Sequence, residues 1–425
     1  MSPHPLRPSR ATPLAGAAIL GLLLAGCSAS PSDSSAPADA ASSAETPSDD
    51  TGSGHGEIEG AAEASEPPLH LVSIDASGSV SLLDLLDGTE TELDGVRAPR
   101  SVASDGRYAF VADEHGVDVV DSGAWTWDHV DHFHYYRADP ASPGTVEGSG
   151  VASIATGMLS TAGGTGVFFP DSGEAVLLDN GALSKGEINE TLRLEVAPHD
   201  GLIAPLGEGA LVTEADGNGR IERVRAVDAA GDEIDSIACT EASGTITTRL
   251  ALVVGCADGA VLATSVAGET ALTKVAYPAD ASGDAPPATE FSARKGRPTV
   301  AGLGDGSGVW LLDTREQSWR WIAMPERPVA ASAVDDEAGH VVTLTPDGRV
   351  RVFDADGAER AATDPIVTDA VGGGGQVSLT VDAQRAYVND PATGAVFEID
   401  YADGARVART LATEVPAHFV AEVGR

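Results

Sequence analysis

The sequence predicts an all-β fold, and two features of the chain lead to this prediction. The 425 residues include 49 Gly and 25 Pro, which favour short strands joined by tight turns over long helices. An apolar strand, a turn rich in Asp and Gly, and a second strand also return about every forty residues. The apolar runs between turns are too short for helices and lack a 3.6-residue period, so an array of β units is indicated.

Repeats of this length are typical of a β-propeller. The first unit extends from Leu69 to Gly95, and the others begin near Arg97, Gly148, Ala197, Ile237, Glu290, Val329 and Gly375. This division predicts eight blades, with seven as the alternative. The first unit lacks an inner strand, and the chain ends in a surplus apolar strand around His418 to Val423. We expect this C-terminal strand to pair with the first blade and close the ring, which removes exposed strand edges.

Ahead of the repeats, residues 1–27 have the features of a lipoprotein signal peptide. Two arginines precede a short apolar run, which ends in the sequence LAGC at Cys27. Small residues followed directly by Cys form a lipobox, in which the Cys is acylated. We therefore expect lipidation of Cys27 and a mature protein at the outer face of the cytoplasmic membrane, with membrane contact only through the lipid anchor. A cleaved signal with an incidental Cys is the alternative.

Residues 28–66 consist mainly of Ala, Ser, Pro, Gly and acidic residues, with nine Asp or Glu and no Lys or Arg. Such a segment cannot bury enough apolar surface to offset its ordering entropy, so we expect a disordered tether before a propeller domain of residues 67–425. The whole chain has 65 Asp plus Glu against 26 Lys plus Arg, a formal net charge of -39. A balance this acidic repels phosphate backbones and excludes nucleic acid as a partner.

Two cysteines remain after Cys27, namely Cys239 and Cys256. An exported protein experiences oxidising conditions, and the spacing of these cysteines suits neighbouring strands of one sheet, so we expect a disulfide between them. A pair of free buried thiols is the alternative. A cysteine-based metal site is not expected because no CxxC is present.

Three of the ten histidines fall in one short stretch, DHVDHFHYYR, which begins at Asp128. In an extended strand residues two apart project to the same face, so His132 and His134 can present both imidazoles to one metal ion. Zinc accepts imidazole nitrogen, and Asp131 or Asp128 can act as a ligand or orient an imidazole. His129 is offset by an odd number of residues and is the weaker candidate. Stacked or capping imidazoles without a metal are the alternative.

Two ligands do not hold zinc, so further ligands must come from other blades. His199 and His418 each stand just before a predicted inner strand, where blades converge, and we expect one of them to complete the site. His115 and His340 lie in Asp/Gly turns and are expected to face solvent.

The string WTWDHVDHFHYYRADP resembles the hallmark segment of the periplasmic zinc metallochaperones of the AztD type. The segment APHDGLIAPL at Ala197, the turn GCADG at Gly255, and the chain end from Arg385 onward are also similar to that family. The resemblance implies a propeller that binds zinc and passes it directly to the solute-binding protein of a zinc ABC importer. This chain departs from the family in its tether, which carries only His55 where relatives carry a His-rich segment.

The motifs also bear on catalysis. The sequence contains no GxSxG or HExxH, and no Cys is placed as a nucleophile, so an enzyme such as a metal-dependent propeller hydrolase is not expected. A propeller lipoprotein that binds a protein or cell-wall partner without a metal role remains the alternative function. Metal content distinguishes that alternative from a zinc carrier.

Overall fold

The computed structural model describes residues 56–128, 132–279 and 285–425. The chain separates into two compact units, Met1–Thr51 and Gly52–Arg425, and the fold concerns the second. In the described residues nearly all regular structure is β, with two short helices, α1 (Asn180–Leu183) and α2 (Thr368–Gly372). Neither helix is long and apolar enough to span a membrane. The prediction of an all-β fold is confirmed.

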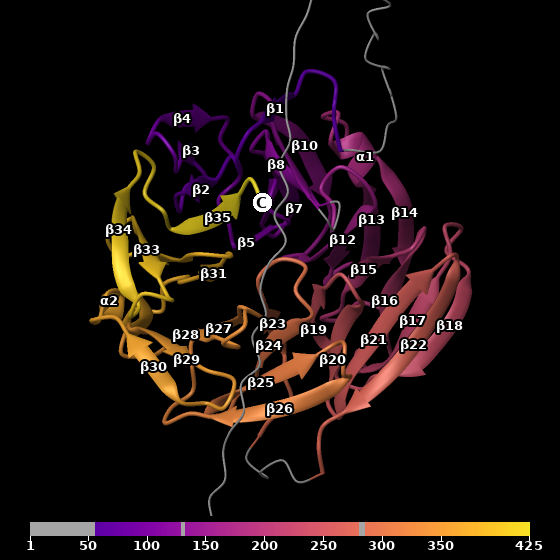
Figure 1. Cartoon of the computed structure of the whole chain (residues 1–425). Helices are drawn as coiled ribbons and strands as arrows, with labels where there is room; N and C mark the ends of the chain where they lie inside the picture. Colours follow the sequence, from indigo (N-terminus) through magenta and orange to yellow (C-terminus); the bar gives the residue numbers. More distant parts are fainter. Residues whose placement is uncertain (1–55, 129–131, 280–284) are drawn as a thin grey trace, which may run out of the picture. The chain divides into compact units, whose positions relative to one another are not determined.

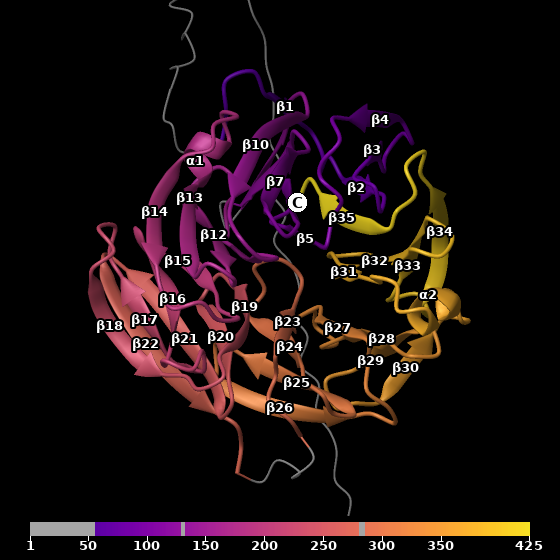
Figure 2. The same cartoon turned by 180° about the vertical axis from the view of Figure 1, so that it is seen from behind.

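The described part of the second unit contains eight antiparallel four-stranded sheets, which follow one another around a common centre (Figures 1 and 2). One sheet contains β35 (Phe419–Val423), β2 (His70–Ile74), β3 (Val80–Asp84) and β4 (Glu90–Leu93). The next contains β5 (Ser101–Ser104), β6 (Tyr108–Ala112), β7 (Gly116–Asp121) and β10 (Ala141–Glu147). It is followed by the sheet of β11 (Ser153–Thr156), β12 (Gly164–Phe169), β13 (Glu174–Asp179) and β14 (Glu190–Glu195).

The other five sheets each use four strands in chain order. The first two contain β15 (Ile203–Leu206), β16 (Gly209–Ala215), β17 (Ile221–Val227) and β18 (Glu233–Ala238), then β19 (Ser243–Thr247), β20 (Leu252–Cys256), β21 (Gly259–Val266) and β22 (Glu269–Ala276). The next contains β23 (Glu290–Ser292), β24 (Thr299–Leu303), β25 (Gly308–Asp313) and β26 (Ser318–Ala323). The last two contain β27 (Ala330–Ala333), β28 (Val341–Leu344), β29 (Val350–Phe353) and β30 (Glu359–Ala362), then β31 (Leu379–Val381), β32 (Ala386–Asp390), β33 (Ala395–Asp400) and β34 (Arg406–Ala412).

Apolar clusters fill the spaces between consecutive sheets and form the core. Leu211 and Val224 of one sheet pack with Val254 and Val261 of the next, for example. Many of the middle strands are therefore buried on both faces, as β6 and β20 are along their whole length. This explains why the sequence shows continuous apolar runs at these strands as well as alternation.

The turns rich in Asp and Gly have a common construction, which the turn before β30 illustrates. The Oδ1 atom of Asp354 accepts hydrogen bonds from the backbone nitrogens of Asp356 and Ala358, each at 2.9 Å. Gly357 adopts a φ of 83°, a conformation that favours glycine. The Asp caps the turn and the Gly reverses the chain, so this short motif separates strands repeatedly.

The C-terminal strand pairs with the N-terminal part of the repeats. β35 lies antiparallel to β2, with a register that runs from Phe419 opposite Ile74 to Val423 opposite His70. After β35 the chain turns at Gly424, whose φ is 95°, and its nitrogen donates to the Gly106 carbonyl at 2.7 Å. The C-terminus consequently lies near the centre of the sheets (Figure 1).

A ninth, three-stranded sheet contains β1 (Ala62–Ala64), β9 (Phe133–Arg137) and β8 (Ala124–Asp128). The β8–β9 hairpin is inserted between β7 and β10, two neighbours in the second sheet. β1 falls in the range for which the sequence predicts a disordered tether. It is ordered here because β9 offers an open edge to which three residues of the tether can pair.

Cys239 and Cys256 form a disulfide with a Cα–Cα distance of 5.1 Å, as the sequence predicts. The expected location within one sheet is wrong. Cys239 directly follows β18, whereas Cys256 ends β20 in the next sheet. The bond therefore joins two consecutive sheets, because the link from β18 to β19 passes the end of β20, where the Ala257 nitrogen donates to the Thr240 carbonyl at 2.9 Å.

Candidate metal centre

The histidine-rich segment lies on the β8–β9 hairpin, which is anchored by aromatic packing. Trp125 is fully buried, and its ring stacks on Tyr136 across the hairpin at a centroid distance of 5.3 Å. The Arg107 guanidinium lies 4.1 Å from the centroid of the Trp125 ring. The cation on the aromatic face adds to the stabilisation that burial of Trp125 provides. These contacts hold the start of β8 and the end of β9 in place.

The structure brings His132 and His134 together. Their Nε2 atoms are 3.0 Å apart, and the rings meet edge to face. Two nitrogens bound to a tetrahedral zinc ion at about 2.0–2.1 Å would be roughly 3.3 Å apart, so a shift of a few tenths of an ångström would admit an ion. Without a metal, the same distance suits an N–H···N hydrogen bond, the capping alternative raised by the sequence.

The other ring nitrogen of His134 has a carboxylate partner from a distant part of the chain. Glu63 of β1 places its Oε1 atom 2.7 Å from His134 Nδ1. The side chains of His134 and Glu63 are 22% and 60% exposed. Sequence reasoning missed Glu63, because nothing distinguishes it from the other acidic residues of the tether.

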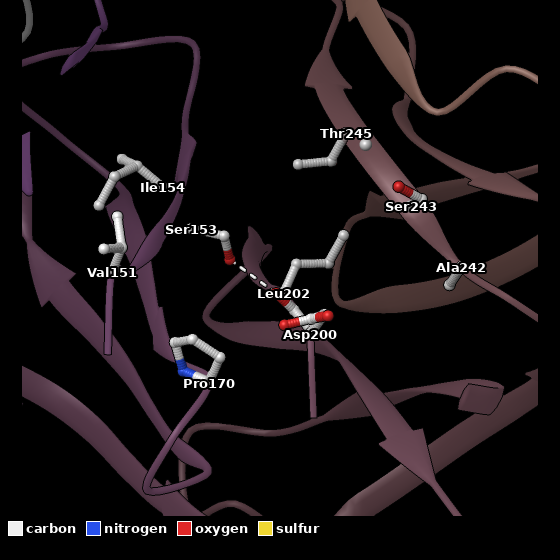
Figure 3. Close-up of a pocket in the computed structure, with 11 residues that line it drawn as sticks. Val151, Ser153, Ile154, Pro170, Asp200, Leu202, Ala242, Ser243 and Thr245 are labelled. Carbon is white, nitrogen blue, oxygen red and sulfur yellow. Dashed lines mark hydrogen bonds between the residues drawn. The ribbon is translucent and has the colours of Figure 1, made fainter. Parts of the chain in front are cut away.

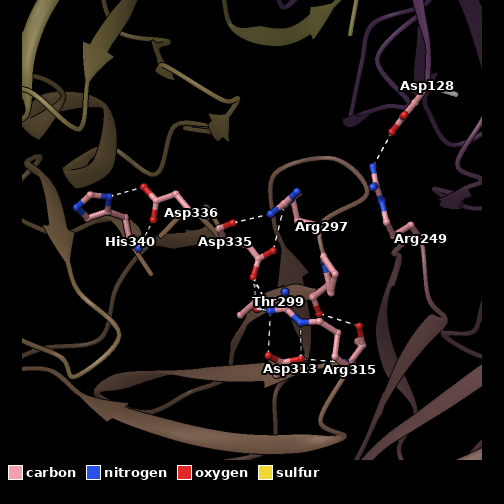
Figure 4. Close-up of polar contacts among 11 residues, drawn as sticks. Asp128, Arg249, Arg297, Thr299, Asp313, Arg315, Asp335, Asp336 and His340 are labelled. Carbon is pink, nitrogen blue, oxygen red and sulfur yellow. Dashed lines mark hydrogen bonds and ion pairs between the residues drawn. The ribbon is translucent and has the colours of Figure 1, made fainter. Parts of the chain in front are cut away.

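Asp128, at the end of β8, forms an ion pair with the loop before β20. Its Oδ2 atom is 2.6 Å from Arg249 Nη2 (Figure 4). Arg249 is 121 residues further along the chain, so this pair ties the end of β8 to the loop between β19 and β20 of another sheet. In this structure Asp128 therefore helps to hold β8 in position through its ion pair with Arg249.

Three of the predicted site residues lie outside the described residues: His129, Asp131 and Cys27. Their predicted roles as metal ligands and as the lipidation site stay predictions.

His199 lies apart from the hairpin and has local partners on both ring nitrogens. Nδ1 is 2.6 Å from the Ala197 carbonyl, and Nε2 is 2.8 Å from Thr213 Oγ1. The ring is buried and packs edge to face on Phe168. Zinc binding would require His199 to break at least one of these hydrogen bonds.

His418 directly precedes β35, with its Nδ1 3.4 Å from the Pro416 carbonyl. His340, the expected turn residue, instead holds a short contact with Asp336 at 2.6 Å, well separated from Asp128 in Figure 4. Among the residues that the structure describes, no group of three or more His, Cys, Asp or Glu side chains is arranged to hold a metal ion. The described part of the hairpin therefore supplies a pair of imidazoles, which neither His199 nor His418 joins.

A cavity of about 290 Å³ lies beside the His199 turn, between the inner strands β11, β15 and β19 (Figure 3). Ser153 donates from Oγ to the Gly201 carbonyl at 2.7 Å along its wall. The charged side chain of this lining is Asp200. One carboxylate supplies too few ligands for a metal ion, so the cavity does not extend the imidazole site.

A second cavity of about 290 Å³ opens between β5, β11, β19 and β23, next to the C-terminus. Lys295 lines it and donates from Nζ to the Arg425 carbonyl oxygen at 2.8 Å. Burial lowers the pKa of Lys295 to about 8 and raises the pKa of Asp105, which also lines the cavity. Burial likewise raises the pKa of Glu422 to about 8, although Arg425 Nη1 lies 3.0 Å away. Lys295 and Glu422 thus both contact Arg425, the last residue of the chain.

No protein-family model matches the chain. The chain is similar to the zinc chaperone AztD of Citrobacter koseri, with 23% identity over 333 residues, which cover 76% of this chain and 78% of that protein. The crystal structure of Citrobacter koseri AztD superimposes with a TM-score of 0.72 at 22% identity, covering 84% of this chain and 97% of that one. The apo structure of the same protein gives 0.71 at 21% identity, with the same coverage.

A more distant neighbour is the dihydro-heme d1 dehydrogenase NirN in complex with DHE, with a TM-score of 0.52 and 14% identity over 85% of this chain and 76% of that one. The structural likenesses establish a propeller-like all-β fold. The sequence similarity to the zinc chaperone AztD extends over most of the chain, so the resemblance of the chain to proteins of the AztD type is confirmed.

Proposed function

We propose that the protein is an extracytoplasmic zinc metallochaperone that delivers zinc to the solute-binding protein of an ABC importer. The observation that carries the proposal is the convergence of the Nε2 atoms of His132 and His134 at 3.0 Å, in a chain similar to a zinc chaperone. Zinc is the cargo of this protein, and no catalytic role is proposed for it.

A site with two imidazoles suits a carrier that must give up its ion. The pair fills half of the four positions of tetrahedral zinc, and His132 is exposed, so ligands of a second protein can approach. His129 and Asp131 precede the pair in the chain and are the proposed additional ligands. His199 and His418 could contribute only after they leave the surroundings described above.

We further propose that the fold is an eight-bladed propeller closed by β35. Support comes from the eight four-stranded sheets among the described residues and from the ladder between β35 and β2. Closure gives β2 a partner along its inner edge, and the outer edge of each blade remains open.

The proposed location is the outer face of the cytoplasmic membrane, with Cys27 as the lipid anchor and residues 28–66 as the tether. The lipobox motif and the apolar run before it support this location. The Cys239–Cys256 disulfide is compatible with an oxidising compartment.

Zinc binding is tested by elemental analysis of protein purified without added metal, followed by competition titrations against a chelator. We expect His132→Ala and His134→Ala each to weaken zinc binding at least tenfold, which corresponds to about 1.4 kcal/mol. His340→Ala is the matched control and should leave affinity unchanged, because its imidazole is paired with Asp336. Equal binding by wild type and the His132→Ala/His134→Ala double variant would reject the site, whereas a wild-type protein that binds no zinc would favour a propeller without a metal role.

Delivery is tested separately, by mixing the zinc-loaded protein with a zinc-specific solute-binding protein in the presence of a chelator. Direct transfer should deliver zinc to the acceptor even when the chelator captures all free ions. Zinc that reaches the acceptor only through the chelator-accessible pool would reject delivery while leaving the binding site intact.

A further inference from the structure

Residues 56–64 form a strap that runs across the histidine face of the hairpin. At one end the Gly56 carbonyl accepts a hydrogen bond from Trp125 Nε1 at 3.0 Å. At the other end β1 pairs with β9, with Ala62 opposite Arg137 and Ala64 opposite Tyr135. The strap is therefore fastened to β8 at one end and to β9 at the other, the two strands of the hairpin.

The register of β1 determines which of its side chains reaches the site. Glu63 stands opposite Tyr136, and Tyr136 shares a strand face with His134, two residues earlier. The Tyr136 and His134 rings stack with a centroid distance of 6.2 Å. This register places the Glu63 carboxylate over His134, and the 2.7 Å contact to Nδ1 follows from it.

A carboxylate at this distance assigns a role to each ring nitrogen of His134. An ionised carboxylate can only accept, so Nδ1 is the donor in this contact, and in a neutral imidazole Nε2 then keeps its lone pair. That lone pair lies on the side of the ring that faces His132 Nε2. A carboxylate on the far nitrogen of a metal-binding histidine fixes the ring orientation and strengthens the metal bond.

We propose that Glu63 is a positioning residue for zinc binding and that it acts only while the strap is docked on the hairpin. This inference rests on the proposed function, since it assumes that His134 is a zinc ligand. β1 has three residues and its Ala62 and Glu63 are exposed, so docking buries little surface. Zinc affinity is thereby coupled to a weakly held element at the end of the tether.

The first test compares glutamate variants in the full chain by chelator competition with zinc. Glu63→Ala should weaken zinc binding about 10- to 100-fold, the range typical of carboxylates that orient a metal-bound histidine. Glu63→Gln should restore affinity to within about threefold of wild type, because its amide oxygen still accepts from Nδ1. Glu59→Ala is the matched control on the same strap and should bind as wild type does. Unchanged affinity in Glu63→Ala, or a Gln variant as weak as the Ala variant, would overturn the assignment.

The second test undocks the strap without altering Glu63. A Cβ at Gly56 would overlap the Trp127 ring, whereas a Cβ at Gly60 would meet nothing within 4 Å. Both glycines have positive φ, 71° and 89°, so a valine is strained at either position and only Gly56→Val adds a clash. Gly56→Val should weaken zinc binding nearly as much as Glu63→Ala, and the double variant should be no weaker than either single one. Gly60→Val should retain affinity; additive losses or equal effects of the two valines would contradict the coupling.

A third measurement separates this inference from the proposed function. In metal-free protein, nitrogen-15 chemical shifts of the His134 ring report which nitrogen carries the hydrogen. We expect the Nδ1–H form in wild type and in Glu59→Ala, and a mixture of both forms in Glu63→Ala. Zinc binding by wild type with no change on Glu63→Ala would reject the inference alone, whereas a wild-type protein that binds no zinc would reject the proposed function.

Discussion

Closure of the ring by the C-terminal strand can be tested with a single buried methyl pair. Val423 of β35 is fully buried and packs with Val72 and Ile74 of β2. Val266, at the end of β21, is 71% exposed. Val423→Ala and Val266→Ala remove the same atoms from the two extremes of burial, so the second variant is a matched control for the first.

The magnitude follows from the groups removed. Loss of two buried carbon groups at about 0.8 kcal/mol each, plus the cavity they leave, lowers the free energy of unfolding by roughly 2 kcal/mol. An unfolding entropy of about 2.1 cal/mol/K per residue, taken over about 370 residues, converts this loss to a decrease in Tm of roughly 3 °C. Val266→Ala should change Tm by less than about 1 °C.

Deletion of the residues after Glu414 extends the test to the whole strand. It removes the ladder to β2 and opens the edge beside Leu71, Val72 and Ile74, all of which are fully buried in the intact chain. We expect a loss of more than about 5 kcal/mol, and aggregation on heating because an apolar edge is exposed.

Calorimetry gives Tm, and light scattering gives aggregation, for the four proteins side by side. A truncated protein that melts within a degree or two of the full chain would refute closure by β35. So would a Val423→Ala variant that melts together with Val266→Ala.

Three further predictions concern stability. Replacement of both Cys239 and Cys256 by Ala should lower Tm by about 4 °C. The disulfide closes a loop with a sequence separation of 17, and it stabilises the fold by about 3 kcal/mol because it restricts the unfolded chain. Thiol titration of the unreduced, denatured wild type should find neither cysteine free. Burial raises the pKa of Glu422 to about 8 in the folded protein, whereas in the unfolded chain this carboxyl loses its proton above about pH 4.3. The folded protein therefore binds one more proton between these pH values, and the free energy of unfolding of the wild type should fall as the pH rises from about 4.3 to 8. Glu422→Gln should lose that part of the decline, and a parallel pH profile of Tm for the two proteins would contradict the assigned titration. Arg107→Ala removes the partner of the buried Asp121, 2.6 Å away, and should lower the free energy of unfolding in urea by about 3–5 kcal/mol. Arg100→Ala breaks the exposed pair with Glu114 and should lower it by less than about 1 kcal/mol. Similar losses in both arginine variants would refute the burial argument.

A charged network between the β23–β26 sheet and the β27–β30 sheet shows how far sequence reasoning extends to charged groups. Arg297 and Arg315 both pair with Asp335, at 3.0 and 2.8 Å, in a network that includes Thr299 (Figure 4). The composition shows that acidic residues are in excess, but it does not show which basic residue each one pairs with. Asp335, for example, lies 38 residues from Arg297 along the chain. Long-range ion pairs of this kind depend on which strands become neighbours.

The histidine site likewise contains residues that the sequence predicts and residues that only tertiary packing places. The spacing of His132 and His134 indicates that both can face one ion, because the period of two in an extended chain is a local property. The expected contribution of His199 depended on the direction of its ring, which tertiary packing sets: the ring is buried against Phe168 and bonded to Thr213. Glu63 was not predicted, because its contact with His134 spans 71 residues.

The sequence by itself determined the strands and the Asp/Gly turns between them, because strand periodicity and turn chemistry act over a few residues. It also determined the pairing of Cys239 with Cys256, because they are the two cysteines left after Cys27. Tertiary structure alone decided that the disulfide joins two sheets, that the β8–β9 hairpin stands apart from its sheet, and that β1 of the tether is ordered on it. Each of these depends on an open edge or a neighbouring sheet being within reach. Such proximity results from the assembly of the sheets and is not encoded in the residues of any one segment.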